Sequence, residues 1–229
     1  MAQSFNPNHA ATLAIRGAER ALFTRTFNAQ GVIATSTVHR TEKSFGQVRD
    51  GLSNTIALSE SVTSVDDDRS DNPRAFVVFV NLTSGISNTN NSPFALPPSE
   101  CRDRALAAGD RTRLDAAVVA ATAANVSRGH TWIAGVVPRV GFTSMLPPNS
   151  PSCNNRNVSP HFEGWGVFSA TSYHPGGVNG ALLDASVRFF PESIDTGVLT
   201  DRVLVAGQRS PYGIWGALAT ISGGESVSF

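Results

Sequence analysis

The segment His174–Phe190 constrains the fold most strongly, because its residues predict a complete β-hairpin. Pro175-Gly176-Gly177 predicts a turn, and Val178–Leu183 has the composition of a strand. The partner strand is expected at 186–190, across a two-residue turn at Asp184-Ala185. A type I′ turn places both central residues at positive φ, so alanine in the second position costs on the order of 1 kcal/mol or shifts the turn type. The chain should therefore contain an antiparallel strand pair.

We expect His174, Gly176, Gly177 and Asp184 to be structural residues of this hairpin. His174 would fix the first turn by a hydrogen bond to a carbonyl or a carboxylate, and Asp184 would form an Asx-type turn bond. The alternative interpretation is a catalytic or metal-binding pair. A hydrolase would also need a nucleophile activated by a base, and the sequence has no Gly-x-Ser-x-Gly elbow. We therefore assign no catalytic residue and predict that the chain is not an enzyme.

The remaining patterns predict an α+β fold, with an N-terminal helix packed on an antiparallel β-sheet and long surface loops. Apolar residues at helical spacing indicate the helices, and apolar runs indicate the strands. Segments rich in Asn, Ser, Thr and Pro indicate the loops. No internal repeat is visible, so we expect residues 1–229 to form one domain. Besides the hairpin, the predicted elements are helices at Asn8–Phe23 and 111–126, strands at 56–61, 75–80, 166–170 and within 131–146, and loops at 81–110 and 147–163.

The charge balance argues against a nucleic-acid partner. The 229-residue chain has 18 basic and 18 acidic side chains and no formal net charge. Nucleic-acid-binding proteins usually have a basic excess that displaces counterions from phosphates. No stretch reaches the roughly 18 consecutive apolar residues of a membrane helix.

The two cysteines, Cys101 and Cys153, lie in polar, proline-flanked segments. One interpretation is a disulfide, which would stabilise the fold by roughly 3–4 kcal/mol in the chain-entropy model and would indicate an oxidising compartment. The other interpretation is two unrelated buried thiols.

Two further groups of residues are candidates for ligand binding. Trp132, Trp165, Trp215 and Tyr173 have rings that would suit a sugar-binding face, although such rings more often pack in a core. The oxygen-rich side chains of Asp66, Asp68 and Asp71 suit calcium, although their loop lacks the glycine and terminal glutamate of an EF-hand. The alternative for these aspartates is a solvated acidic loop. We expect no other metal or cofactor.

Several blocks resemble the prepilin-type protein family of Planctomycetes that is defined by a histidine, nine residues and Asp-Gly. His174 and Asp184 match that spacing, with Ala185 in place of the glycine. The other similar blocks are Asp50-Gly51-Leu52-Ser53-Asn54-Thr55-Ile56 with Glu60, Arg128-Gly129 with Trp132, the segment 143–153, the segment 210–218, and Gly223-Gly224-Glu225.

The resemblance implies a pilin-like or pseudopilin-like structural domain of unknown detailed function, exposed on a bacterial cell surface or secreted. Members of the family begin with a prepilin leader and a hydrophobic helix, which this sequence lacks; the helix at 8–23 is similar to its soluble continuation. Membrane attachment would occur only through that hydrophobic helix. The implied partners are other pilin-like subunits or secretion components, and the implied mechanism is assembly into a filament or secretion apparatus. The alternative function is an extracellular carbohydrate-binding module.

Overall fold

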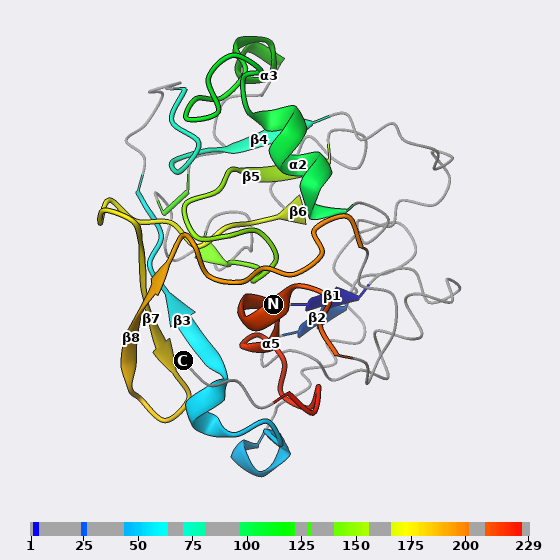
Figure 1. Ribbon diagram of the computed structural model, residues 1–229, viewed down its shortest axis with the longest axis vertical. Helices are drawn as coiled ribbons and strands as arrows, with labels where there is room; N and C mark the ends of the chain where they lie inside the picture. The colour runs from blue at the N-terminus through cyan, green and yellow to red at the C-terminus, as the bar shows by residue number, and fades with distance from the viewer. Residues whose placement is uncertain are drawn as a thin grey trace.

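The computed structural model has an α+β fold, with two three-stranded sheets, one two-stranded pair and several short helices in its described residues (Figure 1). It describes residues 2–4, 24–26, 44–63, 71–80, 97–121, 128–129, 140–155, 166–201 and 209–225. The predicted helix Asn8–Phe23 lies outside these residues. Near the N-terminus, β1 (Ala2–Ser4) pairs in parallel with β2 (Thr24–Thr26).

The predicted hairpin is confirmed as part of a three-stranded antiparallel sheet, which we call the hairpin sheet. Its strand order is β3 (Ile56–Ser59), β7 (Gly177–Leu182) and β8 (Val187–Pro191). β3 enters the sheet from two short 3-10 helices, η1 (Phe45–Gln47) and η2 (Leu52–Asn54).

The turn of the hairpin differs from the predicted two-residue turn. Leu182 and Ser186 form the last strand pair, since the Leu182 N–H donates to the Ser186 carbonyl, and the Ala185 N–H donates back to the Leu182 carbonyl. The loop therefore has three residues, and Ala185 takes the left-handed conformation with a φ of +66°. A three-residue hairpin loop usually places glycine at this position.

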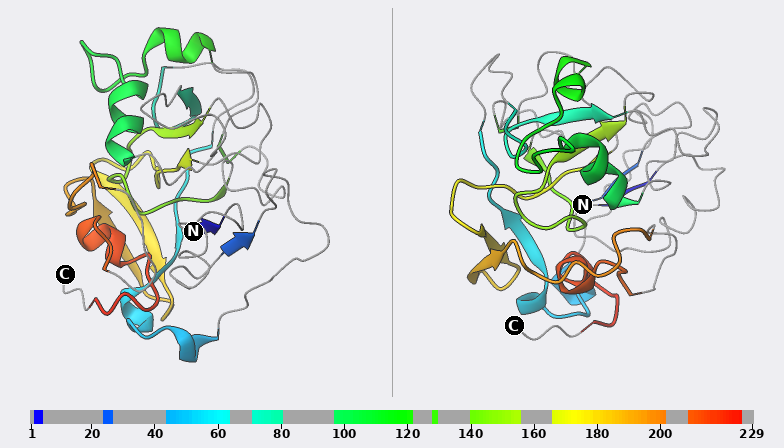
Figure 2. Two further views of the ribbon diagram at one scale, coloured as in Figure 1. Left: turned by 90° about the vertical axis from the view of Figure 1, so that its right-hand side faces the viewer. Right: turned by 45° about the horizontal axis from the view of Figure 1, so that its top comes forward.

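The inner face of the hairpin sheet packs against a helix from the C-terminal part of the chain. This helix is α5 (Gly213–Ala217), which lies across the sheet in Figure 2. Trp215 is fully buried there and stacks near Phe142 and Phe190. The buried residues of this core are Ile56, Ala170, Val178, Leu182, Phe190, Trp215 and Leu218.

A second, mixed sheet has the order β4-β5-β6. β4 (Val77–Val80) runs parallel to β5 (Ser152–Asn155), and β6 (Gly166–Val167) pairs antiparallel with β5. Val77, Val78 and Val80 are at most 2 % exposed, as expected for a continuous apolar run covered on both faces.

Both predicted long loops contain regular structure, so those two predictions are wrong in part. Helix α2 (Pro98–Ala105) occupies the end of the segment 81–110, and β5 lies within 147–163. Pro98 in the first turn of α2 has a fixed φ that suits a helix start. The predicted helix at 111–126 begins later than expected, as α3 (Ala116–Ala121), and positions 122–126 lie outside the described residues; Asp115 accepts hydrogen bonds from the first-turn amides.

A disulfide joins α2 to β5. It links Cys101 and Cys153, which are separated by 52 positions in the sequence and have a Cα–Cα distance of 5.7 Å. Both cysteines are buried in the core between α2 and the mixed sheet. The bond therefore covalently ties the two segments whose regular structure was not predicted.

Candidate functional site

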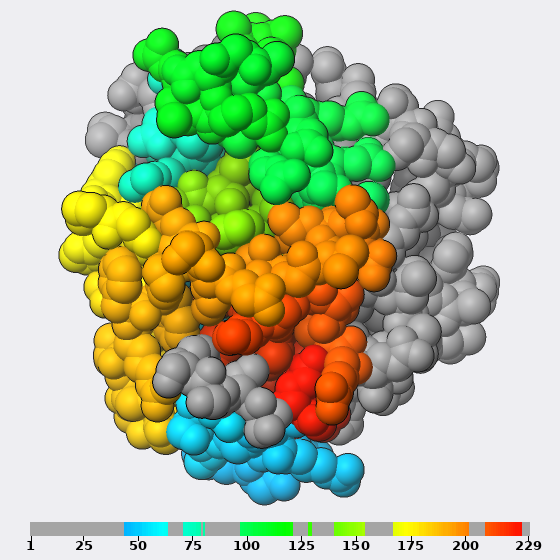
Figure 3. Space-filling model, in the orientation of Figure 1, coloured from blue at the N-terminus to red at the C-terminus, as the bar shows by residue number. Residues whose placement is uncertain are grey.

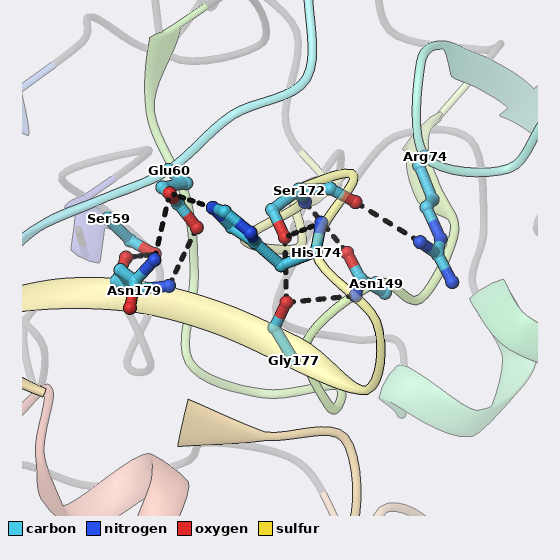
Figure 4. A network of polar contacts seen from close by, with 8 residues as sticks. All are labelled: Ser59, Glu60, Arg74, Asn149, Ser172, His174, Gly177 and Asn179. Atoms are coloured by element: carbon cyan, nitrogen blue, oxygen red, sulfur yellow. Dashed lines mark hydrogen bonds and ion pairs between the residues drawn. The ribbon is translucent and has the colours of Figure 1, made fainter. Parts of the chain in front are cut away.

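The main polar cluster of the described chain surrounds Glu60, at the end of β3 (Figure 4). The Asn179 backbone N–H donates to Glu60 Oε2 at 2.7 Å, and the Asn179 side-chain amide donates to Oε1 at 3.1 Å. His174 Nε2 lies 3.1 Å from the same Oε1. The Glu60 carboxylate thus joins β3, β7 and the turn before β7.

These contacts lower the pKa of the Glu60 carboxyl. Partial burial raises this pKa, but the hydrogen bonds from Asn179 and the charge and hydrogen bond of His174 together outweigh that effect. The carboxylate is therefore ionised at neutral pH, and the His174 ring donates its Nε2 proton to it.

A second part of the cluster fixes the turn itself. The Ser172 hydroxyl donates to the Gly177 carbonyl at 2.7 Å and accepts the His174 backbone N–H at 3.0 Å. Asn149 accepts the Ser172 N–H and donates to Glu192 Oε1, which also pairs with Arg74. Gly177 itself has no room for a side chain, because a Cβ there would collide with the Phe190 carbonyl and the Phe189 ring of β8.

The geometry of the cluster suits a structural role. Ser172 is 5 % exposed, and its one proton is directed at a backbone carbonyl. The His174 ring contacts Glu60, not the Ser172 hydroxyl, which instead accepts the backbone N–H of His174. A nucleophilic serine needs a base within reach of its hydroxyl proton. The described contacts do not provide that pairing.

His174 and Asp184 do not act as a pair, since they lie at opposite ends of β7. Asp184 Oδ1 accepts the Ser186 N–H and hydroxyl, at 2.9 and 2.6 Å. Hydrogen bonds from the side chain and backbone of Ser186, with a smaller effect of the Arg188 charge, lower the pKa of Asp184. Asp184 therefore makes the local turn bond expected of it.

Of the four rings proposed for sugar binding, Trp215 cannot serve, because it is fully buried in the core under the hairpin sheet. Tyr173, next to His174, is 70 % exposed. Trp132 and Trp165 lie outside the described residues.

The proposed calcium ligands are described only at Asp71. Its carboxylate pairs with Arg113 at 2.7 Å, and its carbonyl accepts the Leu114 N–H. Asp66 and Asp68 lie outside the described ranges. Across the part of the chain that the structure describes, no three His, Cys, Asp or Glu side chains gather closely enough to hold a metal ion.

Asp50 connects the start of the hairpin sheet to the C-terminal segment. Its carboxylate accepts the Gly223 and Gly224 N–H groups at 2.8 and 2.9 Å and contacts the Thr220 hydroxyl at 2.9 Å. Glu225 contacts the same hydroxyl at 3.0 Å. Hydrogen bonds to Asp50 therefore join two blocks that are far apart in the sequence, at 50–56 and 223–225.

Arg128 is a buried cation that the sequence did not reveal as such. Its side chain is fully buried and donates to the Ser152 hydroxyl and to the carbonyls of Ser169 and Gly141. Burial lowers its pKa to about 10, so the guanidinium stays charged at neutral pH. Arg128 thereby links β5 to the loops on either side of it.

Part of the outer face of the hairpin sheet, beside the polar pair of Asn179 and Glu60, is apolar and exposed, which sequence analysis missed. Leu58, Val187 and Phe189 are 65, 67 and 49 % exposed. Leu58 on β3 and Val187 on β8 both lie opposite Ala181 of β7, so they form one row across the three strands. Alternation of inward and outward residues within the predicted strands was the available signal. We call Leu58, Ala181, Val187 and Phe189 the outer patch.

Comparisons with known proteins place the chain in a family. A family model described as a protein of unknown function (DUF1559) matches residues 3–197. No curated protein and no solved structure matches significantly. Within the described ranges, no helix has the length and apolarity that a membrane crossing requires. Because the family match covers most of the sequence, the chain belongs to the DUF1559 family of proteins of unknown function.

Proposed function

We propose that this chain is a non-catalytic, pilin-like structural domain, secreted or exposed on a bacterial surface, that acts by assembly with other subunits of a filament or secretion apparatus. The observation that carries the proposal is the outer patch. Large exposed apolar side chains gathered on one sheet face favour a protein contact, and Leu58 and Val187 lie in one row.

Two other observations support this proposal. The polar side chains around His174 bind one another and the backbone, as expected for residues that shape a surface turn. The Cys101–Cys153 disulfide suits an oxidising compartment outside the cytoplasm.

The test is surface assembly in producing cells that express Leu58→Asp. Leu58 is 65 % exposed, so aspartate should fold normally while placing a charge in the contact. We expect at least a tenfold loss of the protein from sheared surface assemblies, with total protein unchanged. Val198→Asp is the matched control, because Val198 is 51 % exposed outside the hairpin sheet. Equal assembly of the Leu58→Asp and Val198→Asp variants would contradict the proposal.

A second candidate is carbohydrate binding at Tyr173. Its ring is 70 % exposed and is followed by His174, which is held in place by Glu60. An exposed ring beside fixed polar groups suits stacking on a sugar. A glycan array would show a ligand that Tyr173→Ala loses and Val198→Ala retains. Signals that are equal for the two variants would exclude this site.

A further inference from the structure

The strand β8 forms the edge of the hairpin sheet, and the hydrogen-bond pattern fixes which of its backbone groups point outward. The Leu182 N–H donates to the Ser186 carbonyl, and the Glu192 N–H donates to the Gly176 carbonyl. In an antiparallel pair, the residues that bond to the neighbouring strand alternate with residues that bond away from it. Val187, Phe189 and Pro191 therefore direct their backbone groups away from β7.

The β7–β8 hairpin lies at the rim of the molecule in Figure 3. β8 has β7 as its partner within the described sheets. Two outward residues, Val187 and Phe189, carry side chains that are 67 and 49 % exposed. An edge of this kind is a template for another strand.

We propose that β8 pairs antiparallel with β8 of a second copy of this chain, about a two-fold axis at Phe189. In this register Phe189 faces Phe189 of the second copy, and Val187 faces its Pro191. Each outward N–H then meets a carbonyl: the two Phe189 residues exchange both bonds, and each Val187 N–H faces the Pro191 carbonyl of the other copy. That carbonyl already accepts the Ile194 N–H of its own chain at 3.0 Å, so the bond from Val187 would use its second lone pair. Pro191 lacks an N–H, and the register asks it only to accept.

The side chains are as compatible with this register as the backbone. All residues facing one another on the outer side are apolar, and Arg188 lies opposite Phe190, so no like charges are directly opposed. The outer patches of the two copies become continuous across the axis. A register centred on Val187 would instead place Phe189 opposite Ala185, in the left-handed turn, and would lose the outer pair of bonds.

The contact deepens the proposed assembly function, on which it rests, and names the partner as a second copy. A two-fold contact uses the same surface on both copies, so it produces a closed dimer that cannot grow through that surface. Growth of a larger assembly therefore needs another surface, for which Leu58 on the opposite edge strand is available.

The first test is the oligomeric state of the purified full chain, measured by sedimentation over a range of concentrations. We expect a monomer–dimer equilibrium that Phe189→Asp weakens at least tenfold, while Leu58→Asp leaves it unchanged. A wild-type chain that stays monomeric, or a dimer that survives Phe189→Asp, would overturn the inference. Circular dichroism of each variant checks that the fold is retained.

The second test fixes the register by cross-linking. A directly opposed, hydrogen-bonded pair has Cα atoms about 5.5 Å apart, which suits a disulfide. Phe189→Cys should therefore oxidise to a covalent dimer. Val187→Cys is the control, because the two Val187 residues would lie four positions apart, or about 13 Å. Equal cross-linking of both variants would overturn the register.

The failure of this contact and the failure of the proposed function are distinguishable. Dimerisation is measured on the purified chain and depends on Phe189, whereas surface assembly is measured on cells and depends on Leu58. A Phe189-dependent dimer with no surface assembly would refute the proposed function and keep the contact. Surface assembly by a chain that is monomeric in solution would refute the β8 contact and keep the proposed function.

Discussion

Ala185 has a backbone conformation that alanine adopts only at a cost. Its φ of +66° lies in the left-handed region, and it stands between Asp184 and Ser186, whose N–H and hydroxyl donate to the Asp184 carboxylate. The hairpin therefore keeps its turn although the residue at its tightest point is unfavourable.

Ala185→Gly should stabilise the protein. Removing the Cβ relieves about 1 kcal/mol of strain, which corresponds to a rise in melting temperature of roughly 2–4 °C for a chain of this size. Thermal unfolding measures the shift. Ala181→Gly, within β7, is the control and should lower the melting temperature, since glycine weakens a strand interior. A lower melting temperature for Ala185→Gly would contradict the turn described here.

Glu60→Gln should destabilise the protein in a pH-dependent way. The pKa of Glu60 in the folded state lies below its ordinary value of 4.5. The stability that the ionised Glu60 contributes to the folded state is therefore present above about pH 4.5, and it is lost as the pH falls through the lower, folded-state pKa. We expect a loss of about 1–2 kcal/mol at pH 7, because the hydrogen bonds from Asn179 and His174 lose their charged acceptor, whose side chain is 33 % exposed.

The measurement is urea unfolding of wild type and Glu60→Gln between pH 3 and pH 7. The difference in free energy of unfolding should shrink at the acidic end of this range. Asp103→Asn, which removes an exposed carboxylate paired with Arg102 and Arg111, serves as the control and should change stability little. A difference that is constant with pH would rule out the role assigned to Glu60.

At the scale of elements, the hairpin sheet could be predicted, and so could β4 and β6 of the mixed sheet, whereas β5 could not. β7 and β8 follow from β-branched and apolar residues between strong turn signals. β5 has the sequence Ser-Cys-Asn-Asn, which shows no apolar alternation, and is a strand because β4 and β6 pair with it. Helix α2 had readable signals, namely Pro98 at the start, Glu100 in the first turn and Arg104 in the last. The loop composition around it obscured them.

Side-chain partners were harder to predict than strands. The interpretation of His174 and Asp184 as turn residues agrees with their contacts. The partner of His174 was not foreseen, because Glu60 is 114 positions away and only the pairing of β3 with β7 brings it close. The burial of Arg128 likewise depends on β5 and on the segments around Gly141 and Ser169, which meet around it only in the folded chain.

The disulfide between α2 and β5 should contribute substantially to stability. Replacing both cysteines with alanine, as Cys101→Ala/Cys153→Ala, should lower the free energy of unfolding by about 3–4 kcal/mol in the chain-entropy model. Denaturant unfolding without reductant measures this loss. With reductant, wild type and the double variant should have similar midpoints. A wild-type midpoint that reductant leaves unchanged would show that the bond contributes little.

At the scale of the whole molecule, the contacts of Asp50 close the chain on itself. Asp50→Ala removes the acceptor of two backbone N–H groups and a hydroxyl, and should cost about 2–3 kcal/mol. Hydrogen exchange at the Gly223 and Gly224 amides should accelerate more than exchange in β7. Asp201→Ala, at an exposed position, is the control and should leave those amides protected. Unchanged protection in Asp50→Ala would contradict this closure.

The same closure determines how the domain would respond to tension. The Arg49 and Asp50 N–H groups both donate to the Ile221 carbonyl, and the Ile56 N–H donates to the Leu218 carbonyl. A pull that enters the domain before Phe45 reaches the bonds of Arg49 and Asp50 before it reaches the hydrogen bonds between β3 and β7. The C-terminal segment around Ile221 would bear part of the force. The strands of the hairpin sheet would separate only after the hydrogen bonds to that segment had broken. In a protein held at one end on a surface exposed to flow, the rupture force would be set by the hydrogen bonds of Arg49 and Asp50 to Ile221 and not by the hairpin sheet.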